Sequence, residues 1–276
     1  MSATAPASPT PRMTAPGLRA MKEAGRPIVM LTAYDFHSAR LVEAAGVDSI
    51  LVGDSLGMTV LGESSTLPVT MDDMVRATRA VSRAVSRVLV IGDMPFMSYQ
   101  ADYAEGMRNA GRLLSEGSAQ AVKLEGATDD TLILIEGIAA AGIPVMGHIG
   151  LTPQSVHELG GYKVQARETA SALKLLEDAH ALEDAGCFAV VLECIPAELA
   201  AIVTAELAIP TIGIGAGADV DGQVLVWLDM AGMGDWSPRF AKQFGQVGAA
   251  LGAAARAYAG EVRSGTFPDR AHSFLE

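Results

Sequence analysis

One pattern repeats along this chain: the end of a helical segment, a glycine, a short gap, an apolar run and then an acidic residue. It occurs in EAAGVDSILVGD, LLSEGSAQAVKLEG and LEDAGCFAVVLEC, where the acids are Asp54, Glu125 and Glu193. AAAGIPVMGHIG has the same form, with His148 in the place of the acid. Glycine just past a helix end adopts the left-handed cap conformation at little cost. The repeat therefore predicts units of a helix followed by a buried strand that ends in a polar side chain.

Apolar segments that read as strands recur along the whole chain. They cover residues 28–34, 49–54, 88–93, 121–125, 144–148, 188–193, 210–215 and 223–228. Helical patterns separate most of them: Thr70 with Asp73 predicts a helix start, and a helix over about 168–185 is expected to turn Leu173 and Leu182 inward. Strands that are apolar throughout and alternate with helices indicate a parallel sheet covered on both faces. Eight such units in about 250 residues match a closed (β/α)₈ TIM barrel, with a doubly wound open sheet as the alternative.

We expect a single barrel domain over residues 21–276, preceded by a disordered tail over residues 1–20. The tail, MSATAPASPTPRMTAPGLRA, is rich in Pro, Ala, Ser and Thr and lacks the apolar core of a signal peptide. The longest uncharged stretch of the whole chain, residues 137–157, is broken by glycines and prolines, so no membrane span is expected. The formal net charge of −12 argues against nucleic acid or an anionic lipid surface as a partner.

Cys187 and Cys194 lie at the two ends of one apolar, strand-like run. An extended strand of that length holds its ends too far apart for a disulfide. Reduced thiols in a cytoplasmic protein are therefore expected.

Asp54, Asp93 and Glu125 end three consecutive predicted strands, so we expect them to be neighbours at the mouth formed by the loops after the strands. A single acid at a strand end is most often a helix cap or a turn former, but polar residues that end five successive strands indicate a shared site. Two full charges ~4 Å apart repel by about 4 kcal/mol at an effective dielectric constant near 20. Three carboxylates therefore need a cation, and their oxygen ligands favour Mg²⁺. Pairing with loop arginines is the alternative.

Three further residues share this predicted mouth. Lys123 lies two residues before Glu125, so the two side chains lie on one strand face. Because a buried lysine needs a partner or a function, we expect it to bind an anion or neutralise the carboxylates, and a purely structural pair with Glu125 is the alternative. His148 is interpreted as a functional residue, against a hydrogen-bonded core histidine. Glu193, across the mouth from the three acids, is the candidate general base, with a pKa raised by apolar surroundings.

GIGAGA, residues 213–218, fits the dinucleotide-binding pattern G-x-G-x-x-A. However, DVDGQ follows where a helix should begin. We therefore expect no nicotinamide site, and expect the glycines to let the backbone approach a ligand or close the barrel.

Six segments in order resemble the ketopantoate hydroxymethyltransferase (3-methyl-2-oxobutanoate hydroxymethyltransferase) family. They are VGDSLGMTVLGESSTLPVT, GDMPFMSY, KLEG, GHIGLTPQSVHELGGYKVQ, VLECIP and IPTIGIGAG, and the likeness runs from about residue 25 to the closing HSF. The resemblance implies a barrel of the phosphoenolpyruvate/pyruvate type, located in the cytoplasm and usually assembled as a homodecamer. It implies transfer of a hydroxymethyl group from 5,10-methylenetetrahydrofolate to 3-methyl-2-oxobutanoate through a Mg-stabilised enolate. The product would be 2-dehydropantoate (ketopantoate), in the first step of pantothenate biosynthesis.

The resemblance also implies roles for individual residues. Asp54 and Asp93 would bind Mg²⁺, with Glu125 as the third carboxylate at the site. The 2-oxo acid would be held by Ser55, which spacing alone does not single out, together with Asp93 and Lys123. Glu193 would accept a proton, and His148 would line the same pocket. One departure is Ala166, where the family often has glycine, and we expect it to tighten a loop near the mouth.

Two alternative functions stay open at this point. One is another metal–enolate barrel enzyme, such as a 2-oxo acid C–C lyase. The other is a non-catalytic barrel that binds a small acid or serves as a component of an assembly.

Overall fold

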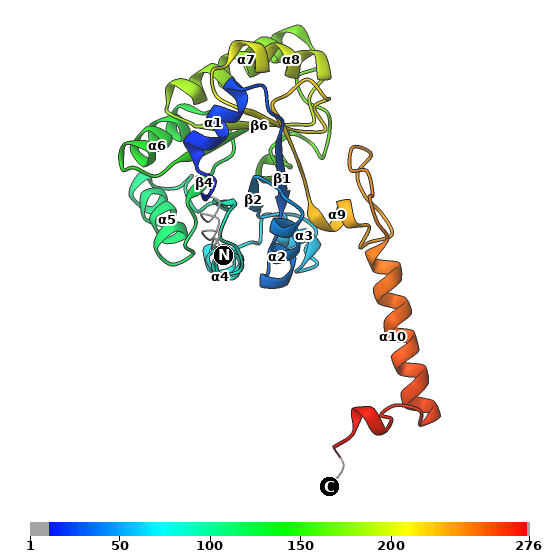
Figure 1. The fold of residues 1–276 in the computed structure, drawn as a ribbon. Coiled ribbons are helices and arrows are strands. Elements are labelled where there is room, and N and C mark those ends of the chain that lie inside the picture. Colours follow the sequence, from blue (N-terminus) through cyan, green and yellow to red (C-terminus); the bar gives the residue numbers. More distant parts are fainter. Residues whose placement is uncertain (1–10, 275–276) are drawn as a thin grey trace, which may run out of the picture. The chain divides into compact units, whose positions relative to one another are not determined.

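The computed structural model describes residues 11–274 and contains a closed barrel of eight parallel strands (Figure 1). Neighbouring strands pair in chain order, and β8 pairs with β1 to close the barrel. The TIM-barrel prediction is therefore confirmed, and the open-sheet alternative is wrong. The strands are β1 (Ile28–Thr32), β2 (Ser49–Val52), β3 (Leu89–Asp93), β4 (Ala121–Lys123), β5 (Val145–Gly150), β6 (Ala189–Glu193), β7 (Thr211–Ile214) and β8 (Gly222–Leu225).

Helices follow the first six strands on the outside of the barrel (Figure 1). They are α2 (Phe36–Ala44), α4 (Met71–Ala84), α5 (Tyr103–Ser115), α6 (Asp129–Ala140), α7 (Thr169–Asp184) and α8 (Ala197–Glu206), and two short elements, α3 (Leu56–Thr59) and η1 (Pro153–Ser155), lie in loops. The capping box of Thr70 and Asp73 begins α4 as expected. In α7 the expected inward side chain Leu173 is 58% exposed, and Leu175 is buried instead. Two residues correspond to about 200° around a helix, so only one of these two side chains can face the barrel.

The barrel interior is filled by apolar side chains of the strands. Met30, Ile91, Met146 and Val191 belong to this core. The helix α1 (Ala15–Glu23) packs Leu18 and Met21 into the same core.

The predicted disordered tail is corrected by α1. Thr14 caps this helix through its side chain, and Pro16 stands in the first turn, where a missing N–H costs nothing. Residues 15–20 are therefore helical, because the buried face of α1 offsets the entropy of ordering them. Residues 1–10 of the predicted tail lie outside the described part of the chain.

The single domain expected over residues 21–276 divides at Leu225 into two compact units. The first contains the whole barrel. The second begins at Val226 and contains α9 (Trp227–Ala231), α10 (Val247–Ser264) and η2 (Arg270–His272). The expected eighth strand thus ends at Leu225, and α9 begins within its predicted range. None of the helices within residues 11–274 is long and apolar enough to cross a membrane.

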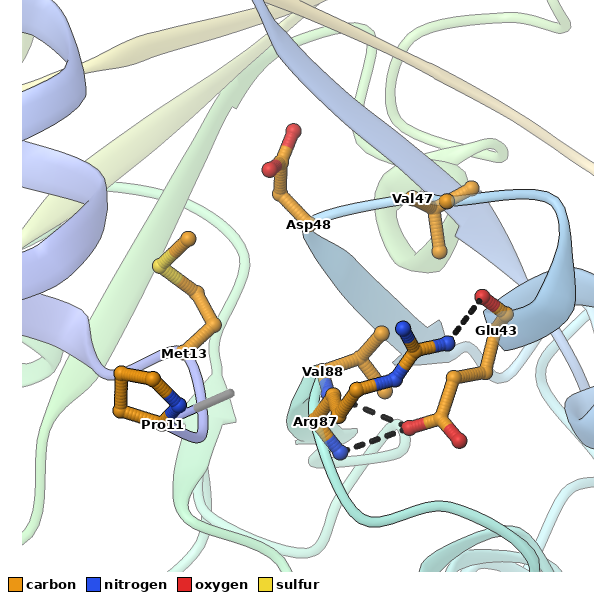
Figure 2. Close-up of a pocket in the computed structure, with 8 residues that line it drawn as sticks. Pro11, Met13, Glu43, Val47, Asp48, Arg87 and Val88 are labelled. Carbon is orange, nitrogen blue, oxygen red and sulfur yellow. Dashed lines mark hydrogen bonds between the residues drawn. The ribbon is translucent and has the colours of Figure 1, made fainter. Parts of the chain in front are cut away.

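A cavity of about 170 Å³ opens beside the amino-terminal ends of β2 and β3 (Figure 2). Val47, Asp48, Arg87 and Val88 line it, and the carboxylate of Glu43 accepts hydrogen bonds from the backbone N–H groups of the segment before β3. Barrel enzymes carry their chemistry at the opposite, carboxyl ends of the strands. This cavity is therefore not the candidate site.

Candidate active site

The polar residues singled out in the sequence lie at the carboxyl ends of the strands from β2 to β6. Asp93, Lys123 and Glu193 are the last residues of β3, β4 and β6; Asp54 and Glu125 lie two residues beyond β2 and β4; His148 lies within β5; and Ser55 directly precedes α3. Five of them are buried, namely Asp54, Asp93, Lys123, Glu125 and His148. For β2, β4, β5 and β6 this common position follows from the repeat of the sequence, because each of these strands begins three or four residues after its glycine.

Ion pairs run from β3 to β6 through this group. Lys123 Nζ lies 2.9 Å from Asp93 Oδ1 and 3.5 Å from Glu125 Oε1. The ring of His148 continues the chain, with Nδ1 3.3 Å from Glu125 Oε1 and Nε2 3.2 Å from Glu193 Oε2. Glu193, expected on the far side of the mouth, is thus linked to the other carboxylates through His148.

Asp54 joins the group through the backbone and a side-chain amide. Its N–H donates to Asp93 Oδ2 at 3.2 Å, and its Oδ2 accepts from Gln154 Nε2 at 3.0 Å. The expectation that Asp54, Asp93 and Glu125 are neighbours is therefore confirmed, since Lys123 and Gln154 each contact two of the three.

The carboxylates differ in their electrostatics. Burial raises the pKa of Asp54 well above its usual range, and the charges of Asp93 and Glu125 raise it further. Burial likewise raises the pKa of Asp93, although Lys123 opposes this. For Glu125, burial works to raise the pKa, but Lys123 and His148 outweigh it and the pKa is lowered. Of these three carboxylates, Asp54 is thus the one whose negative charge is least compensated by neighbouring positive charge.

His148 holds a proton more tightly than an ordinary histidine. Burial and the charge of Lys123 work to lower its pKa, but the carboxylates of Glu125 and Glu193 outweigh them and raise the pKa to about 9. At neutral pH its ring is therefore an imidazolium between two carboxylates. Lys123 Nζ also lies 3.1 Å from its Nδ1, so the ring has charged neighbours at both nitrogens.

The charge balance of this group of side chains is compatible with a divalent cation. Four carboxylates face one lysine and one imidazolium, which leaves two negative charges unmatched when all four are ionised. Arginine supplies no ion pair to the group within residues 11–274, so the arginine alternative is wrong there. No three His, Cys, Asp or Glu side chains of that part of the chain converge as a ready-made metal cluster. A cation bound here would need oxygen ligands from water or substrate in addition to the carboxylates.

Ser55 is held by a residue that the sequence did not indicate. Its Oγ lies 2.9 Å from the hydroxyl of Tyr34, two residues beyond β1. Ser55 thus has a fixed hydroxyl beside Asp54.

Gln154 and Tyr99 were also missed. Gln154, in η1, bonds to Asp54 through its side chain and to Glu125 through its backbone N–H. The hydroxyl of Tyr99 accepts from Glu125 N and lies 2.9 Å from Gln154 Oε1. Neither residue ends a strand, so the repeat carried no signal for them, although both lie within segments that carried the family resemblance.

The loop after β5 depends on left-handed backbone. Gly150 has φ +94°, and a Cβ there would lie 2.3 Å from the carbonyl oxygen of Glu193. Only glycine allows β5 to approach Glu193 this closely. Ala166, further along the loop, also adopts a positive φ of 53°, a conformation that favours glycine.

The glycine-rich segment at β7 does not form a dinucleotide site. Residues 213–218 are followed by β8 and not by a helix. A dinucleotide motif needs a helix amino terminus to receive the pyrophosphate.

Comparison with known families decides what kind of barrel this is. Residues 12–270 match the family model of ketopantoate hydroxymethyltransferase. The chain belongs to the ketopantoate hydroxymethyltransferase family. It is similar to the 3-methyl-2-oxobutanoate hydroxymethyltransferase of Anaeromyxobacter sp. (strain Fw109-5), with 55% identity over 97% of this chain and 89% of the relative. It is equally similar to that of Moorella thermoacetica, with 55% identity over 95% of this chain and 98% of the relative.

Solved structures agree on the fold of this ketopantoate hydroxymethyltransferase family member. A phosphonopyruvate hydrolase superimposes with a TM-score of 0.62 at 16% identity, covering 96% of this chain and 92% of the other. A 2,3-dimethylmalate lyase of the PEP mutase/isocitrate lyase superfamily gives 0.62 at 20% identity, covering 94% and 89%. Identities this low carry the fold alone, and they agree with the closed barrel of eight parallel strands.

Proposed function

We propose that this chain transfers a hydroxymethyl group from 5,10-methylenetetrahydrofolate to 3-methyl-2-oxobutanoate and so forms 2-dehydropantoate (ketopantoate). The observation that carries the proposal is the family match over residues 12–270. Relatives that are named for this activity are 55% identical to the chain. Membership in the family makes the chain a transferase. The reaction would be the first step of pantothenate biosynthesis.

The buried carboxylates fit Mg²⁺, which binds oxygen ligands and commonly uses one or two carboxylates together with water and substrate. Asp54 and Asp93 would hold the ion, with Glu125 as the third carboxylate at the site. The two unmatched negative charges support a divalent cation, and a solved phosphonopyruvate hydrolase of the same fold is a complex with oxalate and Mg²⁺. When bound, the ion would supply a Lewis acid that makes the C–H beside the 2-oxo group more acidic.

The 2-oxo acid would be bound by Ser55, Asp93 and Lys123, with His148 lining the pocket. Lys123 carries a buried positive charge, and its neighbouring carboxylates outweigh burial and raise its pKa, so it stays protonated. Such a cation can offset the charge of the substrate carboxylate. The Ser55 hydroxyl, fixed by Tyr34, supplies a neutral hydrogen bond.

Glu193 would accept the proton that leaves C3 of the substrate. Its side chain is 15% exposed, whereas those of Asp93, Lys123 and Glu125 are at most 3% exposed, so it is the carboxylate that a substrate in the mouth can reach. His148 Nε2 lies 3.2 Å from its Oε2, and the other oxygen would take the proton. The C3–H bond breaks, its proton goes to Glu193, and its electron pair forms the new bond to the folate methylene carbon as one of the two C–N bonds of that carbon breaks toward nitrogen. Water then displaces the second nitrogen: its oxygen bonds to the methylene carbon as the remaining C–N bond breaks. The proton from C3 and the proton from water end on the two nitrogens of the released tetrahydrofolate.

The direct test is to supply purified protein with both substrates and Mg²⁺ and to measure ketopantoate by NMR. Formation that stops in EDTA and returns with Mg²⁺ would support the proposal, whereas no ketopantoate under any condition would end it. Incubation with the 2-oxo acid alone in D₂O is the control. Exchange of the C3 proton without folate separates a catalyst from a barrel that only binds small acids, and cleavage of 2-oxo acid C–C bonds would indicate a lyase.

The assembly and the compartment are part of the same proposal. The family resemblance implies a homodecamer in the cytoplasm, with small molecules as the substrates and no nucleic acid or membrane as a partner. Native mass spectrometry of the purified protein tests the decamer, and a mass equal to one chain would contradict it.

A further inference from the structure

Gln154 contacts two carboxylates of the site without carrying a charge. It lies in the loop after β5, and only 5% of its surface is exposed. The preceding residue, Pro153, begins the short helix η1, which turns the backbone N–H of Gln154 toward Glu125.

Every hydrogen-bonding group of the Gln154 side chain is used. Its Nε2 donates to Asp54 Oδ2 at 3.0 Å and to the carbonyl of Met94 at 2.9 Å. Its Oε1 accepts from the hydroxyl of Tyr99 at 2.9 Å and from Gln100 Nε2 at 3.1 Å. A carboxamide has two donors and two acceptor sites, so its orientation is fixed by four partners. The amide cannot turn without breaking several of them.

The backbone of Gln154 fixes Glu125 at the same time. Its N–H donates to Glu125 Oε2 at 3.0 Å, while Glu125 Oε1 lies near Lys123 and His148. Both oxygens of Glu125 are thus engaged by protein groups. At Asp54, by contrast, the amide engages Oδ2.

From these contacts we propose that Gln154 is a positioning residue, which holds Asp54 in the orientation that binds the divalent cation and keeps Glu125 out of direct coordination. This rests on the proposed function, which supplies the cation. A lysine or arginine in its place would neutralise the charge that attracts the cation, and a carboxylate would repel Asp54. The amide of Gln154 donates a hydrogen bond to Asp54 without changing the net charge of the site.

Tyr99 helps to fix the orientation of the Gln154 amide. Its hydroxyl contacts Gln154 Oε1 and also accepts from the backbone N–H of Glu125. It therefore joins the loop after β3 to the loops after β4 and β5. Its removal should loosen the amide without removing the amide's contact with Asp54.

The test is the binding of Mn²⁺, as a spectroscopic substitute for Mg²⁺, to full-length protein without substrate, followed by EPR. Gln154→Met keeps the volume and removes the polar contacts, and it should raise the Kd for Mn²⁺ by about 10- to 100-fold, the usual effect of a residue that orients a metal ligand. Saturating metal should restore most of kcat. Tyr99→Phe should show a smaller rise, and it carries the test if Gln154→Met does not fold.

Gln120→Met is the matched control. Gln120 also makes two amide hydrogen bonds, to Val90 N and Ser118 O, but it precedes β4 at the opposite end of the barrel. Its Kd should equal that of the wild type. Equal Kd values for Gln154→Met, Tyr99→Phe and wild type would overturn the inference. A wild-type chain that binds no Mn²⁺ would instead overturn the proposed metal site.

Discussion

Replacing Lys123 with methionine tests the charge balance of the site directly. The Nζ atom lies 2.9 Å from Asp93, and both side chains are at most 3% exposed. At that distance the attraction is about 6 kcal/mol for an effective dielectric constant near 20. Part of it is offset by the cost of burying the lysine. Removing one partner of a buried pair usually costs about 3–5 kcal/mol, because the other charge stays buried and uncompensated.

Thermal unfolding in EDTA is the assay. A loss of ~3–5 kcal/mol corresponds to a Tm lower by roughly 6–20 °C for a chain of this size. Millimolar Mg²⁺ should recover part of this loss, since a cation beside Asp93 supplies the missing positive charge. The effect on stability should therefore depend on the metal.

Lys22→Met is the control for this experiment. Lys22 pairs with Asp221 at the same distance of 2.9 Å, but at the amino-terminal end of the barrel, and these side chains are 14% and 15% exposed. Its loss should be smaller and should not change with Mg²⁺. A Tm of Lys123→Met within 2–3 °C of the wild type in EDTA, or a loss that Mg²⁺ leaves unchanged, would refute the reasoning.

Three further outcomes follow from the same cluster. Asp54→Asn should weaken Mg²⁺ binding in calorimetry by more than ~10-fold and should stabilise the metal-free protein at neutral pH by ~1–3 kcal/mol. The sign follows from its raised pKa, because such an acid stabilises the folded state at low pH and loses this contribution as the pH rises above 3.8. Glu193→Gln should bind both substrates yet slow C3 proton exchange by ~10²–10⁴-fold, and wild-type exchange would remove Glu193 from the role of base. His148, with its pKa raised from 6.5 to about 9, contributes stability that is complete below about pH 6.5 and is lost as the pH rises through 9. His148→Gln should therefore flatten the plot of Tm against pH between these values, and an unchanged slope would contradict the charged ring.

The sequence determined the barrel and the ends of its strands. Several strand candidates follow a helix and a capping glycine, and all eight are short apolar runs, so these local signals located the strands from short windows. The alternation of helix with fully apolar strand also determined that Asp54, Asp93, Lys123, His148 and Glu193 would meet, since parallel strands place their carboxyl ends on one rim.

The tertiary structure decided which of these groups pair. Whether Lys123 compensates Asp93 or Glu125, and whether His148 reaches Glu193, depends on the register between strands that are distant in sequence. It also decided that the barrel ends at Leu225, the last residue of β8 that pairs with β1. The role of Gln154 in contacting two carboxylates could be recognised only from the tertiary structure. Its partners come from loops separated by up to 100 residues, and hydrogen bonds across such separations leave no periodic trace in the sequence.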